Sequence, residues 1–315
     1  MDATEAANEL ISQIRDRPWG LAVVALSGEQ IEYRIDTGRD QIQRNSLFQI
    51  GSITKTMTGV LLATAVIRGE VALDTPLSEV LGVTGAARDI NLLELATQRS
   101  GLPRLPPNLD LATIDQSDPY ATYAEDDLRH ALDNVELGDK TFEYSNFGFM
   151  ALALAVATTA AAPFDALLEE RLFKPSGMTA AGCPPTDQGR VVGYAGATPT
   201  PWWTTRLPGS GGVGASIEDL ASYLRAHLYP PTGELGEAIT LATTIHAPGP
   251  SPMGLGWGHQ GGGWFHDGGT GGFSSFAAFH RPTATAVGLL ANGGNLMGLD
   301  RAGMSVLTAM VKGTV

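Results

Sequence analysis

Residues 257–291 read WGHQGGGWFHDGGTGGFSSFAAFHRPTATAVGLLA. Residues 257–266, 273–280 and 285–291 are short runs of largely apolar and aromatic side chains, and glycine clusters or a proline turn separate them. Runs of this kind between turn residues are typical of short strands. A helical pattern follows over about residues 299–311, so the end of the chain predicts three strands and a final helix.

The beginning of the chain carries a matching pattern. Residues 3–15 place apolar side chains at helical spacing, and residues 21–26 and 30–35 flank a polar turn, which predicts a helix and a β-hairpin. These elements at one end and three strands at the other predict one antiparallel sheet built from both ends of the chain. The predicted fold class is therefore α+β, an antiparallel sheet flanked by helices with an inserted helical domain.

The middle of the chain differs from its ends, because helical patterns there alternate with connections rich in proline and glycine. We expect a discontinuous sheet domain formed by residues 1–70 and 230–315, a mostly helical domain over residues 71–229, and the active site between them. Within the middle, Ser216 and Asp219 form a capping-box pattern that predicts a helix over residues 217–228.

Composition and charge narrow the function. Of the 315 residues, 43% are hydrophobic, and 20 basic against 33 acidic residues give a net charge of −13, which argues against nucleic acid as a partner. The single cysteine, Cys183, excludes an intrachain disulfide, and neither cysteine nor histidine spacing predicts a metal site. The acidic first residues lack a signal-peptide pattern and residues 147–163 are too short for a membrane span. We expect no cofactor, no membrane partner and a cytoplasmic location, or else the mature end of an exported protein.

Ser52 and Lys55 are the first candidates for chemistry. They stand three residues apart at the start of a helix over residues 52–68, whose later turns are strongly apolar, so the two side chains share one face. The positive end of a helix favours a neutral lysine, and a neutral amine can remove a serine proton for nucleophilic attack. The alternative is an ordinary helix start with an exposed lysine.

Tyr144 and Asn146 are the second candidates. Residues two apart in an extended segment point the same way, so the phenol and the amide would line one cleft. Tyr144 would then shuttle a proton near Ser52, and Asn146 would hold Lys55 and a substrate carbonyl. In the alternative interpretation, Ser145 or Asn146 only caps the following helix and Tyr144 packs.

Residues 266–272, HDGGTGG, are the third candidate. In a strand, His266 and Gly268 would face one side and Asp267 the other. A glycine-rich strand edge lets a substrate lie against the backbone and offers N–H groups to a developing oxyanion. The alternative is a glycine-rich hairpin with an incidental histidine.

Taken together, the three motifs resemble the serine β-lactamase and penicillin-binding-protein-like family, in particular its class C β-lactamase, D-alanyl-D-alanine carboxypeptidase and esterase branch. That family has Ser-x-x-Lys, Tyr-x-Asn and Lys/His-x-Gly in this chain order. The resemblance extends over about residues 20–295 and includes flanking segments: FQIG at 48–51, SGL at 100–102, Phe142-Glu143 and KPSGM at 174–178.

The resemblance implies a role for each matching residue. Ser52 would be the acylated nucleophile, Lys55 its base or base partner, and Tyr144 a group acting in acylation and deacylation. Asn146 would position Lys55 and the substrate, and His266 would take the place of the third-motif lysine. The backbone N–H groups of Ser52 and Gly269 would form the oxyanion hole, next to Gly268. The implied substrate is a small-molecule ester or amide, with no metal or cofactor.

Two features modify that expectation. His266 is only partly charged near neutral pH and Asp267 adds a negative charge, which favours an esterase, peptidase or acyltransferase over a β-lactamase. Trp202 and Trp203 are expected either to form an aromatic wall for an acyl group or only to pack between domains. We therefore expect a serine hydrolase; the alternatives are a transacylase of small-molecule biosynthesis, which passes the acyl group to an amine or alcohol, and a non-catalytic penicillin-binding-like sensor or scaffold.

Overall fold

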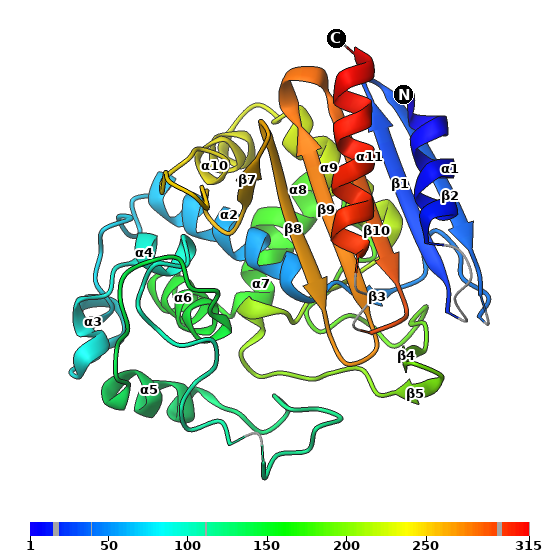
Figure 1. Ribbon diagram of the computed structural model, residues 1–315. Coiled ribbons are helices and arrows are strands. Elements are labelled where there is room, and N and C mark those ends of the chain that lie inside the picture. The colour runs from blue at the N-terminus through cyan, green and yellow to red at the C-terminus, as the bar shows by residue number, and fades with distance from the viewer. Residues whose placement is uncertain (15–18, 39, 111, 295–297, 315) are drawn as a thin grey trace.

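The computed structural model describes residues 1–14, 19–38, 40–110, 112–294 and 298–314. Its largest feature is a six-stranded antiparallel sheet in the order β2-β1-β10-β9-β8-β7 (Figure 1). The strands are β1 (Leu21–Ser27), β2 (Gln30–Asp36), β7 (Gly258–Gln260), β8 (Gly263–Gly269), β9 (Ser274–His280) and β10 (Thr285–Ala291). The prediction of an α+β fold with a sheet from both chain ends is confirmed, since β1 pairs with β10 and places Leu21 opposite Ala291.

One expected strand is wrong in its extent. Residues 257–266 form two strands rather than one, because Gly261 and Gly262 turn the chain between β7 and β8. Their φ angles are +60° and +83°, a backbone conformation that other residues rarely adopt. As a result β8 runs on through His266 to Gly269, and the third candidate motif lies inside a strand.

Helices cover both faces of the sheet. α1 (Ala3–Gln13) and α11 (Leu299–Thr314) pack on one face, and α9 (Ile217–Leu228) packs on the other (Figure 1). Successive side chains of a strand point to opposite faces, so Val23 packs with α1 and α11 while Val24 belongs to the core on the α9 side. Burial on both faces explains why residues 21–26 are apolar without alternation.

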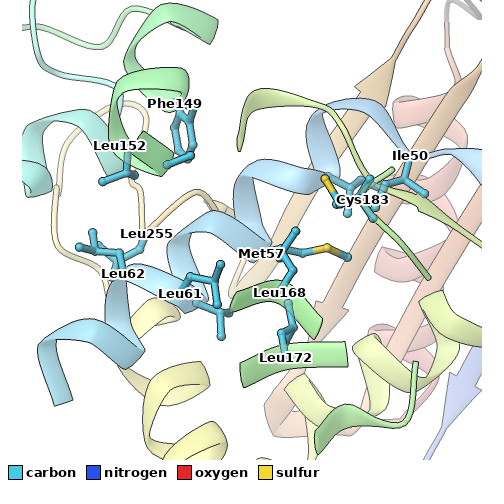
Figure 2. Close-up of a cluster of buried hydrophobic side chains, with 14 of the residues drawn as sticks. Ile50, Met57, Leu61, Leu62, Phe149, Leu152, Leu168, Leu172, Cys183 and Leu255 are labelled. Atoms are coloured by element: carbon cyan, nitrogen blue, oxygen red, sulfur yellow. The ribbon is translucent and has the colours of Figure 1, made fainter. Parts of the chain in front are cut away.

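The helix predicted over residues 52–68 is the central helix of the molecule. It begins with a 3₁₀ turn, η1 (Gly51–Ile53), and continues as α2 (Thr54–Ile67), which is buried from Thr54 to Ala65. Figure 2 shows Met57, Leu61 and Leu62 of α2 among apolar side chains of the surrounding elements, which include α6 (Asn146–Thr159) and α7 (Phe164–Leu168). This packing on all sides fixes the first turn of α2, where Ser52 and Lys55 lie.

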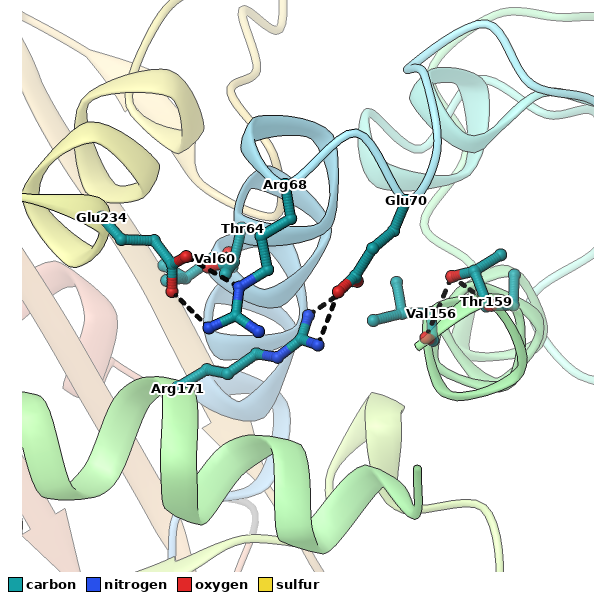
Figure 3. Close-up of polar contacts among 9 residues, drawn as sticks. Val60, Thr64, Arg68, Glu70, Val156, Thr159, Arg171 and Glu234 are labelled. Atoms are coloured by element: carbon teal, nitrogen blue, oxygen red, sulfur yellow. Dashed lines mark hydrogen bonds and ion pairs between the residues drawn. The ribbon is translucent and has the colours of Figure 1, made fainter. Parts of the chain in front are cut away.

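The far end of α2 is held by two bidentate ion pairs (Figure 3). Arg68 donates to both carboxylate oxygens of Glu234 at 2.7 and 2.8 Å, at the start of α10 (Glu234–Ala242). Arg171, in the π-helical turn η3 (Glu169–Phe173), donates in the same way to Glu70 at 2.8 and 2.7 Å. Two parallel hydrogen bonds fix orientation as well as distance, so this end is a structural anchor.

The remaining elements are short. They are α3 (Leu77–Leu81), η2 (Ala86–Asp89), α4 (Leu92–Ala96), α5 (Glu125–Asn134), α8 (Lys174–Ser176), η4 (Pro208–Ser210), η5 (Arg281–Thr283), β3 (Phe48–Gln49) paired with β6 (Gly214–Ala215), and β4 (Gly193–Ala195) paired with β5 (Thr198–Thr200). The predicted capping box is confirmed: Ser216 Oγ accepts from the Asp219 N–H at 3.1 Å, and α9 begins at Ile217.

The inserted region, residues 71–229, is less separate from the sheet than its sequence pattern indicates, because its helix α9 packs on the sheet. The domain boundaries at residues 70 and 229 stay predictions. Among the described residues, no single helix has the length and apolar character to cross a membrane. Asn146–Thr159 and Phe164–Ser176 meet that criterion only as a pair bent by 82°, on length and composition alone.

Candidate active site

The structure brings Ser52 and Lys55 into contact at the start of α2. Lys55 Nζ lies 2.9 Å from Ser52 Oγ, and it also donates to the backbone carbonyl of Ser210 at 2.6 Å. The Lys55 side chain is fully buried, whereas Ser52 remains partly exposed to a cleft. The alternative of an exposed lysine at a helix start is therefore wrong.

Burial changes the acid–base character of Lys55. Loss of hydration lowers the pKa of its ammonium group well below the ordinary lysine value, the positive charge of Arg104 lowers it further, and Asp267 opposes the shift. A neutral amine can donate one hydrogen to the Ser210 carbonyl and keep its lone pair for the Ser52 hydroxyl proton. The pair thus has the geometry and the charge state that a general base and its nucleophile require.

Two glycines allow the end of β8 to touch the backbone of the Ser52 turn. Gly51 has a φ of +48°, and a Cβ on it would lie 2.6 Å from the backbone nitrogen of Gly269. A Cβ on Gly268 would lie 2.2 Å from the Ile50 carbonyl oxygen and 3.0 Å from the Ser52 nitrogen. The Ser52 and Gly269 N–H groups, which the family resemblance assigns to an oxyanion hole, therefore belong to touching backbone segments.

Tyr144 completes a three-residue cluster with Ser52 and Lys55. Its phenol lies close enough to Ser52 for that side chain to lower its pKa, and Lys55 Nζ lies 4.9 Å from the centre of its ring. Burial is the main cause that raises the pKa of the phenol, with Asp267 adding to the shift, so Tyr144 is protonated near neutral pH. A protonated phenol beside a neutral amine leaves Lys55 as the acceptor of the serine proton and Tyr144 as a proton donor.

Asn146 lies in the cleft but departs from its expected contact. Among the described residues no hydrogen bond joins it to Lys55, whose Nζ donates to the Ser210 carbonyl instead. Its Nδ2 donates to the Tyr120 hydroxyl at 3.3 Å, and its Oδ1 is buried without a partner. Ser145 caps α6, accepting from the Gly148 N–H at 2.9 Å, so the capping alternative holds for Ser145 while Asn146 is left to face the cleft.

His266 lies in β8 and is buried against Tyr144, with the two ring centres 6.2 Å apart. Its Nδ1 donates to the Asp267 carbonyl at 2.6 Å. Burial is the main cause that lowers the pKa of the imidazole, and Lys55 adds to the shift, so His266 is neutral near pH 7. The place of the third-motif lysine therefore carries no fixed positive charge.

The two tryptophans have different roles. Trp203 lines the cleft, in edge-to-face contact with Tyr120 at 5.8 Å between ring centres. Trp202 does not line it; its ring packs on Phe273 at 5.1 Å, and its Nε1 donates to the Val191 carbonyl at 2.8 Å. The expectation of an aromatic wall thus applies to Trp203, and the packing alternative applies to Trp202.

The cleft has a volume of about 740 Å³ and carries charges that sequence reasoning did not place there. Arg104 and Asp300 line it together with Asp267. The Arg104 guanidinium lies 5.1 Å from the Tyr144 ring centre and has no carboxylate partner within the described part of the chain. The SGL segment at 100–102 shortly before Arg104 was the one sequence feature that could have indicated a cleft residue there. Asp300 stands at the start of α11, where no local motif indicates a site.

In the ranges that the structure describes, no three His, Cys, Asp or Glu side chains gather closely enough to hold a metal ion.

Comparison with known sequences agrees with this arrangement. The chain belongs to the β-lactamase family, because the family model described as Beta-lactamase matches residues 7–305. Among its relatives is the D-alanyl-D-alanine-carboxypeptidase/endopeptidase AmpH of Escherichia coli strain K12, which is 29% identical over 250 residues, covering 71% of this chain and 63% of that protein.

Two relatives named Beta-lactamase are similarly distant. That of Providencia stuartii is 29% identical over 166 residues, covering 50% of this chain and 41% of the relative. The Beta-lactamase of Escherichia coli strain K12 is 28% identical over 229 residues, covering 70% of this chain and 59% of the relative. The chain thus spans less than two thirds of the length of each of these relatives.

Proposed function

We propose that this protein is a serine hydrolase that forms an acyl-enzyme on Ser52 and cleaves a small-molecule ester or amide. The observation that carries the proposal is the 2.9 Å contact between Ser52 Oγ and the buried Lys55 Nζ, whose pKa is lowered by burial. Family membership and relatives named as hydrolases support the same class of chemistry.

In the proposed mechanism, Lys55, assisted by Tyr144, removes the Ser52 proton as Ser52 Oγ attacks the substrate carbonyl carbon. The N–H groups of Ser52 and Gly269 stabilise the oxyanion, and Asn146 orients the substrate. Tyr144 then gives its own proton to the leaving oxygen or nitrogen as its bond to carbon breaks, and the proton held by Lys55 returns to the Tyr144 oxygen. Water attacks the acyl-enzyme by the reverse route and releases a carboxylic acid.

The charges of the cleft favour some substrates over others. At the place of the third-motif lysine, a carboxylate beside the scissile bond would meet the neutral His266 and the exposed Asp267. The positive charge of the cleft, Arg104, lies instead over the Tyr144 ring. We therefore propose that esters without that carboxylate are better substrates than β-lactams. Transfer of the acyl group to an amine or alcohol uses the same first half-reaction, and added acceptor that diverts the product would identify it.

The test is intact-protein mass spectrometry after incubation with p-nitrophenyl butyrate, a fluorescent penicillin or a fluorophosphonate. We expect an adduct on the wild-type protein and on Ser176→Ala, a serine outside the cleft whose hydroxyl donates to the Leu172 carbonyl, but none on Ser52→Ala. An adduct retained in a folded Ser52→Ala variant would overturn the assignment. If no reagent labels the folded wild-type protein, a non-catalytic binding module becomes the better interpretation.

A further inference from the structure

A small pocket and the larger cleft meet at Ser52 and share six lining residues. We infer that the enzyme takes a short acyl group in the small pocket and a large, polar leaving group in the rest of the cleft, an inference that rests on the proposed acyl-enzyme. A pocket of about 50 Å³ and the cleft of about 740 Å³ both include Ser52 in their walls. The substrate must therefore place its smaller part in the pocket.

The position of Tyr144 decides which part of the substrate lies where. The leaving oxygen or nitrogen has to receive a proton as its bond to the acyl carbon breaks, and Tyr144 is the protonated group that lines the cleft beside Ser52. Tyr144 lines the cleft but not the small pocket. The leaving group thus occupies the cleft, and the acyl chain is directed into the pocket.

Hydrogen bonds from two side chains hold the segment at Trp203 and Thr204, which lines the small pocket. Gln49, three residues before Ser52, donates to the Trp203 carbonyl at 2.8 Å and accepts from the Trp203 N–H at 3.1 Å. Asp118 accepts from the Thr204 N–H at 2.8 Å and from its hydroxyl at 2.6 Å. These four bonds fix the backbone on both sides of the Trp203 ring.

The Trp203 ring has little room to turn away. A Cβ on Gly271 would lie 2.8 Å from Trp203 Nε1, so the backbone of this loop closes one side of the ring. The Tyr120 ring lies against Trp203 in edge-to-face contact, and the Tyr120 hydroxyl accepts a hydrogen bond from Asn146 Nδ2. Widening the pocket would require breaking these contacts, so its size limits the substrate.

The small pocket, at about 50 Å³, has less than a tenth of the volume of the cleft, at about 740 Å³, so it favours a short acyl chain such as acetyl to butyryl. The cleft instead offers charged and polar side chains, among them Arg104, Asp267 and Asp300. A leaving group rich in hydroxyl or amine groups would replace the water that hydrates these residues.

Chain-length preference tests the acyl half of the inference. We expect kcat/KM for p-nitrophenyl octanoate to be at least about tenfold below that for the butyrate, and Trp203→Ala to raise the octanoate-to-butyrate ratio about tenfold. Trp202→Ala is the matched control, because Trp202 lies outside the cleft and should leave the ratio unchanged. Because the ratio is internal to each variant, a loss of folded protein does not alter it.

Each outcome separates this inference from the proposed function. Equal rates with octanoate and butyrate, or an equal effect of both tryptophan variants, would overturn the short-acyl limit even if Ser52 is labelled. Absence of any Ser52 adduct would instead overturn the proposed function.

The leaving-group half has its own measurement. We expect acetyl esters of a monosaccharide to be cleaved at least about tenfold faster than ethyl acetate, and Asp300→Asn or Arg104→Gln to reduce that ratio. Equal kcat/KM for the two acetyl esters would overturn this half.

Discussion

Two buried polar clusters meet the first turn of α2 at consecutive residues, and the first of them opens to the cleft. Lys55 belongs to the first, with Ser52 and Tyr144. Thr56, the next residue, belongs to the second: its hydroxyl lies 2.8 Å from that of Tyr223, whose backbone carbonyl accepts from His227 Nδ1 at 2.9 Å.

The two clusters share most of the signs that are used to find active sites. Burial raises the pKa of both Tyr144 and Tyr223, lowers that of Lys55, and lowers that of His227 to about 3. The second cluster is fully buried among aromatic rings, whereas Ser52 and Tyr144 are partly exposed in the cleft. Shifted pKa values therefore report burial, and access to substrate distinguishes a reactive cluster from a structural one.

Replacing Lys55 should have the largest effect. Lys55→Met keeps the length and removes the amine, and we expect acylation by p-nitrophenyl butyrate to slow by about 10³–10⁴-fold because the base is lost. Stopped-flow release of p-nitrophenol measures the rate. Thr56→Val is the matched control in the other cluster, with acylation within about twofold of wild type. An unchanged acylation rate in Lys55→Met would exclude Lys55 as the base.

Removing the Tyr144 hydroxyl should have the next largest effect. We expect Tyr144→Phe to lower kcat/KM by about 10²-fold, since the ring packing remains while the phenol proton that the leaving group needs is lost. Steady-state kinetics measures this loss of kcat/KM, and an ester with a poor leaving group depends most on proton donation by Tyr144. A loss below about threefold with such an ester would mean that the leaving group is protonated elsewhere.

The pH profile tests the charge state of Lys55. Its pKa is lowered, so the amine stays neutral, and the enzyme active, at pH values where an ordinary lysine is charged; below the lowered pKa, kcat/KM should fall about tenfold per pH unit. A half-maximal point near the ordinary lysine pKa of about 10.5 would contradict a neutral Lys55.

Unfolding must be measured alongside that profile. Burial lowers the pKa of His227 to about 3, so the unfolded chain binds a proton below about pH 6.5 that the folded chain does not bind until about pH 3. The free energy of unfolding therefore decreases as pH falls through this window, and His266 adds to the effect in the same direction. Far-UV circular dichroism at each pH separates loss of fold from loss of activity.

The cleft charge should have a smaller effect. We expect Asp267→Asn to raise kcat/KM for a carboxylate-bearing ester by about threefold to tenfold relative to its uncharged analogue, because one repulsive charge in the cleft is removed. The gain should shrink at high ionic strength. Asp74→Asn, an exposed aspartate that does not line the cleft, should change neither substrate. Equal changes with both substrates would show that Asp267 does not act through charge.

The smallest effect on activity should come from the second cluster. Tyr223→Phe makes the same chemical change as Tyr144→Phe, but it removes only the bond to Thr56. We expect the free energy of unfolding to fall by about 0.5–1.5 kcal/mol and kcat/KM to stay within about twofold. Urea denaturation and steady-state kinetics measure the two quantities. A large loss of kcat/KM in the folded variant would break the distinction between the clusters.

Local patterns predicted much of the fold. The helix at Ile217–Leu228 follows from its capping box, and the strand at Thr285–Ala291 follows from an apolar run with turn residues before it. The single strand expected over residues 257–266 failed because Gly261 and Gly262 take positive φ angles, and glycine permits that conformation without requiring it.

By itself, the sequence determined the reactive pair, because Ser52 and Lys55 are close in the chain and helix geometry fixes their separation. It also determined that β8 would place His266 and Gly268 on one side. Only the tertiary structure decided that Lys55 is buried, that Asn146 bonds Tyr120, and that Trp203 lines the cleft while Trp202 packs elsewhere. These outcomes depend on contacts between segments far apart in the chain, whose packing no local spacing specifies.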